Sequence, residues 1–155
     1  MSITFGHTNI IATDWKLLAS FYKNVFSCIE VPPQRSQSGK WLEEGTGVAN
    51  AQLEGVHLRL PGHGNTGPTL EIYSYSKMEE KPPSVANRKG FGHIAFTVDN
   101  VATIVEKVLA HHGSLLGKIT QNNVPGVGLL TFVYCEDPEE NIIEIQSWKK
   151  PQGLK

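Results

Sequence analysis

The chain has 155 residues, of which 39% are hydrophobic and 19% are charged, and its formal net charge is -1. This composition can fill the core of one compact domain or of two fused half-domains, and it is unlike that of a disordered chain. The near-neutral charge gives no basic surface, so we expect neither nucleic acid nor an anionic membrane as a partner.

The opening residues lack the basic and apolar regions of a secretory signal, and no apolar run approaches the roughly 20 residues of a membrane-spanning helix. Two cysteines are too few for a disulfide framework, and we interpret both as small apolar core residues. We therefore expect a cytoplasmic protein.

The first half of the chain is predicted to hold one amphipathic helix. Residues 7–12 are typical of a strand, residues 13–14 can cap a helix, and apolar side chains then recur at helical spacing from Leu17 to Phe26. Three strand-like segments follow, at roughly 48–53, 56–60 and 69–75. We expect turns at Gly55 and at Pro61-Gly62.

The second half repeats this order. Residues 94–98 are typical of a strand, Asp99 or Asn100 can cap a helix with apolar residues from Val101 to Leu109, and Gly113 is expected to end it in a left-handed conformation. Three strand-like segments follow, at roughly 114–119, 128–135 and 142–148. Each half is thus predicted to be a β-α-β-β-β module.

These elements predict an α+β fold of two tandem βαβββ modules. The first module spans residues 1–78 and the second spans 91–149, with a polar linker at 79–90 and a short tail at 150–155.

The most informative motif occurs once in each module. The tripeptide Phe-Gly-His stands at residues 5–7 and again at 91–93, and each module ends on an apolar strand with a glutamate at its centre, Glu71 or Glu144. Two separated matches in the same order indicate an internal repeat. A buried carboxylate needs a partner, and histidines with carboxylates are ligands of divalent metals. The competing interpretation is an outward-facing glutamate and a surface histidine.

The modules differ in length, since 64 residues separate His7 from Glu71 and 51 separate His93 from Glu144. We place the extra residues in Pro32–Gly47 and Pro61–Gly67, as loops that are candidates for a lid over a substrate.

Other polar and aromatic residues have weaker claims on a site. His57 alternates with leucines and is interpreted as a strand-face residue, His63 as a loop residue, and His111-His112 as the end of a helix whose dipole suits a cation. Trp41 and Tyr73 are candidates to line a pocket. Three cationic residues could pair with a substrate carboxylate, namely Arg59, Arg88 and Lys118. We expect each of them to be a solvated surface residue instead.

Four stretches covering nearly the whole chain resemble the vicinal oxygen chelate superfamily, and they are GHTNIIATDWKLLASFYKNVF, TLEIYSY, GHIAFTVDNV and DPEENIIEI. The superfamily includes glyoxalase I, methylmalonyl-CoA epimerase, extradiol dioxygenases and the fosfomycin and bleomycin resistance proteins. The resemblance implies paired modules whose curved sheets form a cup around a metal, commonly in a homodimer. It also implies ligands on the first and last strand of each module, where His7, Glu71, His93 and Glu144 fall.

Glu71 helps to choose within the superfamily. Extradiol dioxygenases and fosfomycin-modifying enzymes resemble one another in using three protein ligands, whereas glyoxalase I and the epimerase use four, with Glu or Gln at this position. A bacterial glyoxalase I would be expected to carry Arg and Asn where this chain has Ile11 and Tyr75. The resemblance therefore implies four-ligand chemistry without implying a glutathione conjugate.

Two neutral imidazoles and two carboxylates balance one divalent ion, and Zn, Ni, Co, Mn and Fe are all compatible. Octahedral geometry would leave two positions for a small-molecule substrate with vicinal oxygens. The metal would act as a Lewis acid while a glutamate removes a carbon-bound proton. Glu144 is the first choice for this base and Glu71 the second.

We thus expect a glyoxalase-like, metal-dependent lyase or isomerase. One alternative is a non-catalytic small-molecule binding or resistance protein of the same fold. Another is a non-haem iron dioxygenase of the extradiol type.

Overall fold

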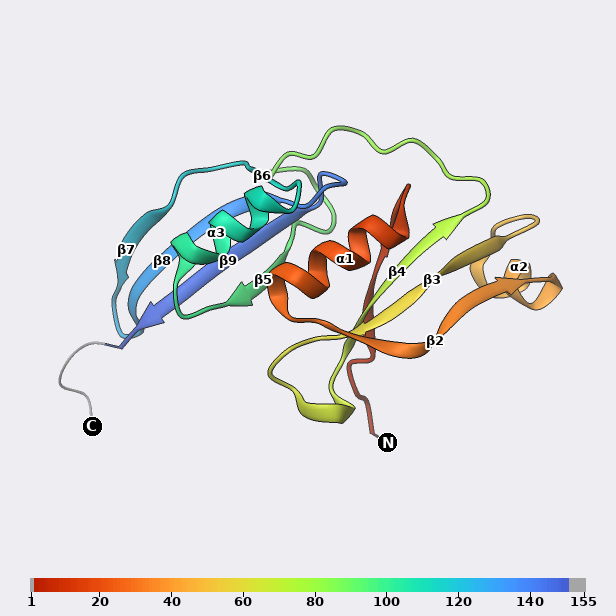
Figure 1. The fold of residues 1–155 in the computed structure, drawn as a ribbon, viewed down its shortest axis with the longest axis horizontal. Helices are drawn as coiled ribbons and strands as arrows, with labels where there is room; N and C mark the ends of the chain where they lie inside the picture. The colour runs from red at the N-terminus through yellow and green to blue at the C-terminus, as the bar shows by residue number, and fades with distance from the viewer. Residues whose placement is uncertain (1, 151–155) are drawn as a thin grey trace. The chain divides into compact units, whose positions relative to one another are not determined.

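The computed structural model describes residues 2–150, and these divide into two compact units with the boundary between Lys81 and Pro82 (Figure 1). Each unit is one sheet with a helix on it, and each begins with the β-α order predicted from the sequence. The predicted α+β fold of tandem βαβββ modules is confirmed. The predicted tail at 150–155 lies, except for Lys150, outside the described residues.

The first unit contains the elements β1 (His7–Ile11), α1 (Trp15–Phe26), β2 (Ile29–Ser38), α2 (Lys40–Thr46), β3 (Gln52–Arg59), a 3₁₀ turn η1 (Gly64–Thr66) and β4 (Thr69–Tyr75). The strand order is β1-β4-β3-β2. Strand β1 runs parallel to β4, and the other neighbours are antiparallel. The two ends of the module therefore meet as adjacent strands.

Helix α1 forms where the sequence predicts it. The Asp14 carboxylate accepts hydrogen bonds from the backbone N–H groups of Lys16 and Leu17, each at 3.0 Å, which satisfies donors that the first turn leaves free. One face of α1 is buried, with Phe21 and Tyr22 at its centre. This face lies on strands β3 and β4, so the opposite face of the sheet is left for other contacts (Figure 1).

Two predictions about the first unit are wrong. The segment Pro32–Gly47 is not a loop, because it continues β2 past a register shift between Val31 and Arg35 and then forms α2. The predicted strands 48–53 and 56–60 are one strand, β3, and Gly55 lies inside it rather than at a turn. A Cβ atom on Gly55 would lie 2.0 Å from the carbonyl oxygen of Ile72, so β3 and β4 need a glycine there.

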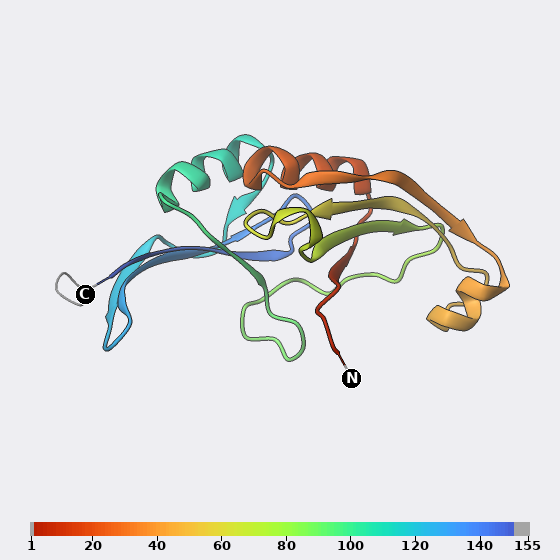
Figure 2. The same cartoon turned by 90° about the horizontal axis from the view of Figure 1, so that it is seen from below.

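The second unit contains β5 (Ile94–Thr97), α3 (Val101–Ala110), β6 (Ser114–Leu115), β7 (Thr120–Val124), β8 (Gly128–Glu136) and β9 (Ile142–Lys149). Strand β5 runs parallel to β9, β8 is antiparallel to β9, and both β6 and β7 pair with the long strand β8. Asn100 caps α3 through a hydrogen bond from Thr103 N of 3.1 Å. Helix α3 covers one face of its sheet, as Figure 2 shows.

The second unit also departs from prediction in two places. Of the expected strand 114–119, only Ser114 and Leu115 form a strand, β6, and the next strand, β7, begins at Thr120. The residue with left-handed backbone after α3 is His112, with φ of 70°, and not Gly113. Gly113 serves close packing instead, because a Cβ there would lie 2.6 Å from the carbonyl oxygen of Glu136.

Each unit holds one free cysteine in its core. Cys28 is 4% exposed and Cys135 is 0% exposed, so the prediction of small apolar core residues is confirmed. Burial raises the pKa of the Cys28 thiol to about 12 and that of Cys135 to about 11. Among residues 2–150, no helix is long and apolar enough to cross a membrane.

Candidate metal-binding site

The repeated histidine and glutamate occupy equivalent places in the two sheets. In the first unit, Glu71 of β4 is paired with Asn9 of β1, two residues after His7. In the second, Glu144 of β9 is paired with Ala95 of β5, two residues after His93. Since side chains two residues apart share one face of a strand, each histidine projects beside its glutamate.

Each unit brings its own pair into contact. The distance from Nε2 of His7 to Oε2 of Glu71 is 3.2 Å, and that from Nε2 of His93 to Oε2 of Glu144 is 2.9 Å. The carboxylates are mostly buried, with 12% of the Glu71 side chain and 16% of the Glu144 side chain exposed. Neither glutamate is thus an outward-facing residue of an alternating strand.

The donor spacing in each pair fits two neighbouring ligands of one metal ion. Ligands bound at right angles with bonds of about 2.1 Å lie roughly 3 Å apart. Each pair would supply one imidazole nitrogen and one carboxylate oxygen, the donor types that Zn, Mn, Fe, Co and Ni accept. Within residues 2–150, however, no group of three or more His, Cys, Asp or Glu side chains is arranged to hold a metal ion.

The Glu71 carboxylate has further partners in its own sheet. His57 lies opposite Glu71 in the pairing of β3 with β4, and its Nε2 is 3.0 Å from Oε1 of Glu71. The Tyr73 hydroxyl is 2.7 Å from the same nitrogen and donates to Oε1 at 3.4 Å. Thr69 Oγ1 lies 3.5 Å from the other ring nitrogen of His57. Sequence reasoning placed His57 on the strand face but missed its contact with Glu71.

This network is built from neutral donors. Burial is the main reason that the pKa of His57 lies below its usual value of 6.5. The Glu71 charge opposes this shift, and the charges of Arg35 and His7 add to it. Burial, and next the Glu71 charge, raise the pKa of Tyr73 to about 12. Tyr73 therefore keeps its proton at neutral pH and remains a hydrogen-bond donor.

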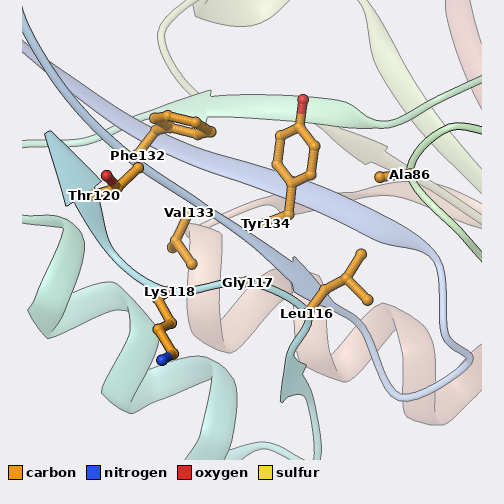
Figure 3. A pocket seen from close by; sticks show the side chains of 8 residues that line it. All are labelled: Ala86, Leu116, Gly117, Lys118, Thr120, Phe132, Val133 and Tyr134. Carbon is orange, nitrogen blue, oxygen red and sulfur yellow. The ribbon is translucent and has the colours of Figure 1, made fainter. Parts of the chain in front are cut away.

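Around Glu144 the corresponding position carries an aromatic residue. Tyr134 lies opposite Glu144 in the pairing of β8 with β9, and its ring centroid is 4.8 Å from that of His93. Tyr134 and Phe132 also line an open pocket of about 270 Å³ within this unit, together with Leu116 and Ala86. Figure 3 shows these two rings projecting from the same side of β8, while Val133 projects from the other side.

The family model for the Glyoxalase/Bleomycin resistance protein/Dioxygenase superfamily matches residues 4–145, which is nearly the whole chain. The chain belongs to this superfamily. The resemblance inferred from the four sequence stretches is therefore confirmed. None of the curated proteins has significant sequence similarity to this superfamily member.

Solved structures of the superfamily share its fold. A glyoxalase family protein from Bacillus cereus is 16% identical, with a TM-score of 0.74 over 94% of this chain and 93% of that one. The fosfomycin resistance protein FosX from Listeria monocytogenes, solved with Mn(II) and sulfate, is 16% identical, with a TM-score of 0.54 over 96% and 95%. A superfamily enzyme from Burkholderia phytofirmans PsJN is 15% identical, with a TM-score of 0.56 over 93% and 98%. At these identities the likeness shows the fold alone.

The remaining predicted residues of this superfamily member fall in several environments. Trp41 is 60% exposed on α2, whereas Tyr73 is 8% exposed and belongs to the network around Glu71. His63 precedes η1, and His111 contacts the carbonyl oxygen of Lys107 at the end of α3, at 2.9 Å. Sequence reasoning did not single out Arg35, whose charge acts on both His57 and Tyr73.

Proposed function

We propose that the protein is a metal-dependent lyase or isomerase that transfers a proton at a carbon next to a metal-chelated carbonyl. The observation that carries this proposal is the histidine–glutamate contact at the same strand register in both modules. Two such pairs, used together, provide two imidazoles and two carboxylates for one divalent ion.

The ion would be Zn, Ni, Co, Mn or Fe, held by His7, Glu71, His93 and Glu144. The two pairs come either from one chain or from two copies in a homodimer. When bound, the metal supplies Lewis-acid stabilisation of the charge that develops on the substrate's vicinal oxygens. That FosX was solved with Mn(II) supports divalent-metal binding in a chain of this fold.

Glu144 is the proposed base. Its side chain is 16% exposed and its carboxylate contacts His93. It lies opposite Tyr134 of the neighbouring strand, which lines the apolar pocket of the second unit. A substrate whose apolar part rests against Phe132 and Tyr134 would bring its reacting carbon toward this carboxylate. Glu71 also contacts His57 and Tyr73, and these contacts favour a fixed carboxylate there.

The test is deuterium incorporation from heavy water into a panel of α-hydroxycarbonyl compounds and acyl thioesters. We expect exchange that requires the metal and that falls sharply in Glu144→Gln at saturating metal. Unchanged exchange in that variant would remove Glu144 as the base. Elemental analysis that found full metal occupancy in both His7→Ala and His93→Ala would contradict the ligand assignment.

A second candidate is a non-catalytic small-molecule binding or resistance protein. The open pocket lined by Phe132, Tyr134 and Leu116 favours it, because aromatic walls bind planar apolar ligands without chemistry. Saturable binding of an aromatic probe with no exchange in any compound would support this candidate. Metal-dependent oxygen uptake with catechols would instead identify a dioxygenase of the extradiol type.

A further inference from the structure

We propose that His57 and Tyr73 are positioning residues that hold Glu71 by its Oε1 atom and so present Oε2 to the metal beside His7. This inference rests on the proposed function, since it assigns roles to residues around one of the proposed ligands. The observation that carries it is that the two carboxylate oxygens of Glu71 contact different residues.

The two oxygens of Glu71 have different neighbours. Oε1 is 3.0 Å from His57 Nε2 and 3.4 Å from the Tyr73 hydroxyl, whereas Oε2 is 3.2 Å from His7 Nε2. A carboxylate with one oxygen engaged by two donors can bind a metal through the other oxygen. The hydrogen bonds then fix the orientation of the carboxylate before the metal binds. A glutamate without them would have to lose its rotational freedom on binding.

The hydrogen-bond directions are mutually compatible. Glu71, when ionised, can only accept, so His57 must carry its proton on Nε2 to donate to Oε1. The Tyr73 hydroxyl then donates to Oε1, and its oxygen faces the His57 Nε2–H at 2.7 Å. Nδ1 of His57 is left as an acceptor toward the Thr69 hydroxyl. No group in this arrangement needs a charge other than that of the carboxylate.

The Tyr73 ring is itself held in place by the sheet and by α2. Gly55 lies opposite Tyr73, and a Cβ on it would be 2.5 Å from Cδ1 of the ring, so the ring occupies the space that glycine leaves. The ring also packs in a buried cluster with Leu42 of α2 and with Ala51 and Leu53. The position of the hydroxyl is therefore set by packing before any metal binds.

Comparison of the modules favours positioning over ligation for His57. The equivalent position in the second unit is Tyr134, opposite Glu144, and the repeat therefore supplies one histidine and one glutamate per module. At the position opposite the glutamate, the first module thus has a histidine where the second has a tyrosine. His57 contacts Oε1, whereas His7 contacts Oε2. This separation is expected of a residue that acts through Glu71 and does not bind the metal itself.

The test compares the affinity of the full chain for Co²⁺ in four variants, by competition with a chelating dye. His57→Leu is expected to weaken binding about 10–100-fold, the usual effect of removing a partner of a ligand. Tyr73→Phe should weaken it less, and His57→Gln should recover part of the loss because its amide can donate. Tyr75→Phe is the matched control, since Tyr75 lies two residues further along β4 beside the same apolar cluster, and its affinity should equal that of the wild type.

X-ray absorption of the Co²⁺ complexes adds a readout that does not depend on affinity. We expect the same number of imidazoles per metal in the wild type and in His57→Leu. One imidazole fewer in His57→Leu would make His57 a ligand and overturn the inference. Wild-type affinity in both His57→Leu and Tyr73→Phe would overturn it as well.

The failure of this inference differs from a failure of the proposed function. If the wild type binds no Co²⁺, the metal centre itself is wrong and the inference falls with it. If the wild type binds and the variants bind equally well, only the positioning role is wrong. Should His57→Leu not fold, as judged by thermal unfolding of the metal-free protein, Tyr73→Phe decides alone because it removes a single oxygen atom.

Discussion

The two modules share one backbone pattern around their glutamates but surround them with different chemistry. Opposite Glu71 stands His57, which contacts the carboxylate, and opposite Glu144 stands Tyr134, whose ring lies against His93 and lines a pocket. An internal repeat can thus keep the geometry of a histidine–glutamate pair while the neighbouring strand changes what the pair does. In the first module the residue opposite the glutamate contacts the carboxylate, and in the second it lines a pocket.

The largest expected effect on activity comes from replacing each of the two glutamates with glutamine, one at a time. In metal-saturated protein, Glu144→Gln should lower the rate of substrate deuterium exchange about 10²–10⁴-fold, because a general base contributes that much. Glu71→Gln should act mainly by weakening metal binding. Exchange rates and metal affinities measured on both variants check this. Equal losses of exchange at full metal occupancy would abolish the distinction between the modules.

A smaller effect is expected from Gly55→Ala, which disturbs the first module alone. The added Cβ would lie 2.0 Å from the Ile72 carbonyl oxygen and 2.5 Å from Tyr73, so β3 and β4 must move apart. Overpacking of this kind lowers the free energy of unfolding by about 1–3 kcal/mol. Urea unfolding of the metal-free protein is the measurement. Gly45→Ala is the control, since a Cβ there meets nothing within 4 Å.

The second module has its own sensitive point in the turn between β8 and β9. Asp137 is 2% exposed and accepts hydrogen bonds from the backbone N–H groups of Glu139 and Asn141, each at 2.9 Å, and from the Asn141 amide. Asp137→Ala would leave these donors without their acceptor, at a cost of about 1–3 kcal/mol. A midpoint of thermal unfolding equal to that of the wild type would show that water replaces the carboxylate.

The smallest effect is expected at the exposed cap of α1. Asp14→Ala removes the acceptor of two backbone N–H groups, and such losses lower the free energy of unfolding by about 0.5–2 kcal/mol. Asp14→Ser should retain most of the stability, because its hydroxyl can also cap. The same chemical denaturation measures both. A larger loss in Asp14→Ser than in Asp14→Ala would contradict the capping explanation.

The sequence predicts the parts of this molecule that depend on local signals. Helices α1 and α3 each have a polar cap and apolar side chains at helical spacing, and the last strand of each module has apolar residues on either side of its glutamate. The histidine–glutamate pairs were found because the chain repeats itself. The repeat makes a residue such as His93 informative, although one histidine before a strand says little.

The remaining errors have a physical reason, which is that strand pairing is not written in any short segment. Pro32-Pro33 indicates a loop, yet β2 pairs with β3 on both sides of an irregularity there. Gly55 indicates a turn, but it is required by the close approach of β4. His57 reaches Glu71 only through the register of β3 with β4, which side-chain alternation alone does not fix.

Because each unit has one buried thiol, the reactivity of that thiol can report the local opening of its unit. Cys28 and Cys135 are protonated and covered at neutral pH, so a thiol reagent can reach either one only when its unit opens. The two labelling rates, resolved by mass spectrometry of the peptides, therefore measure the opening of the two modules separately in a single sample. A metal that joins both modules should slow both rates together, whereas a ligand of the pocket beside Tyr134 should protect Cys135 first.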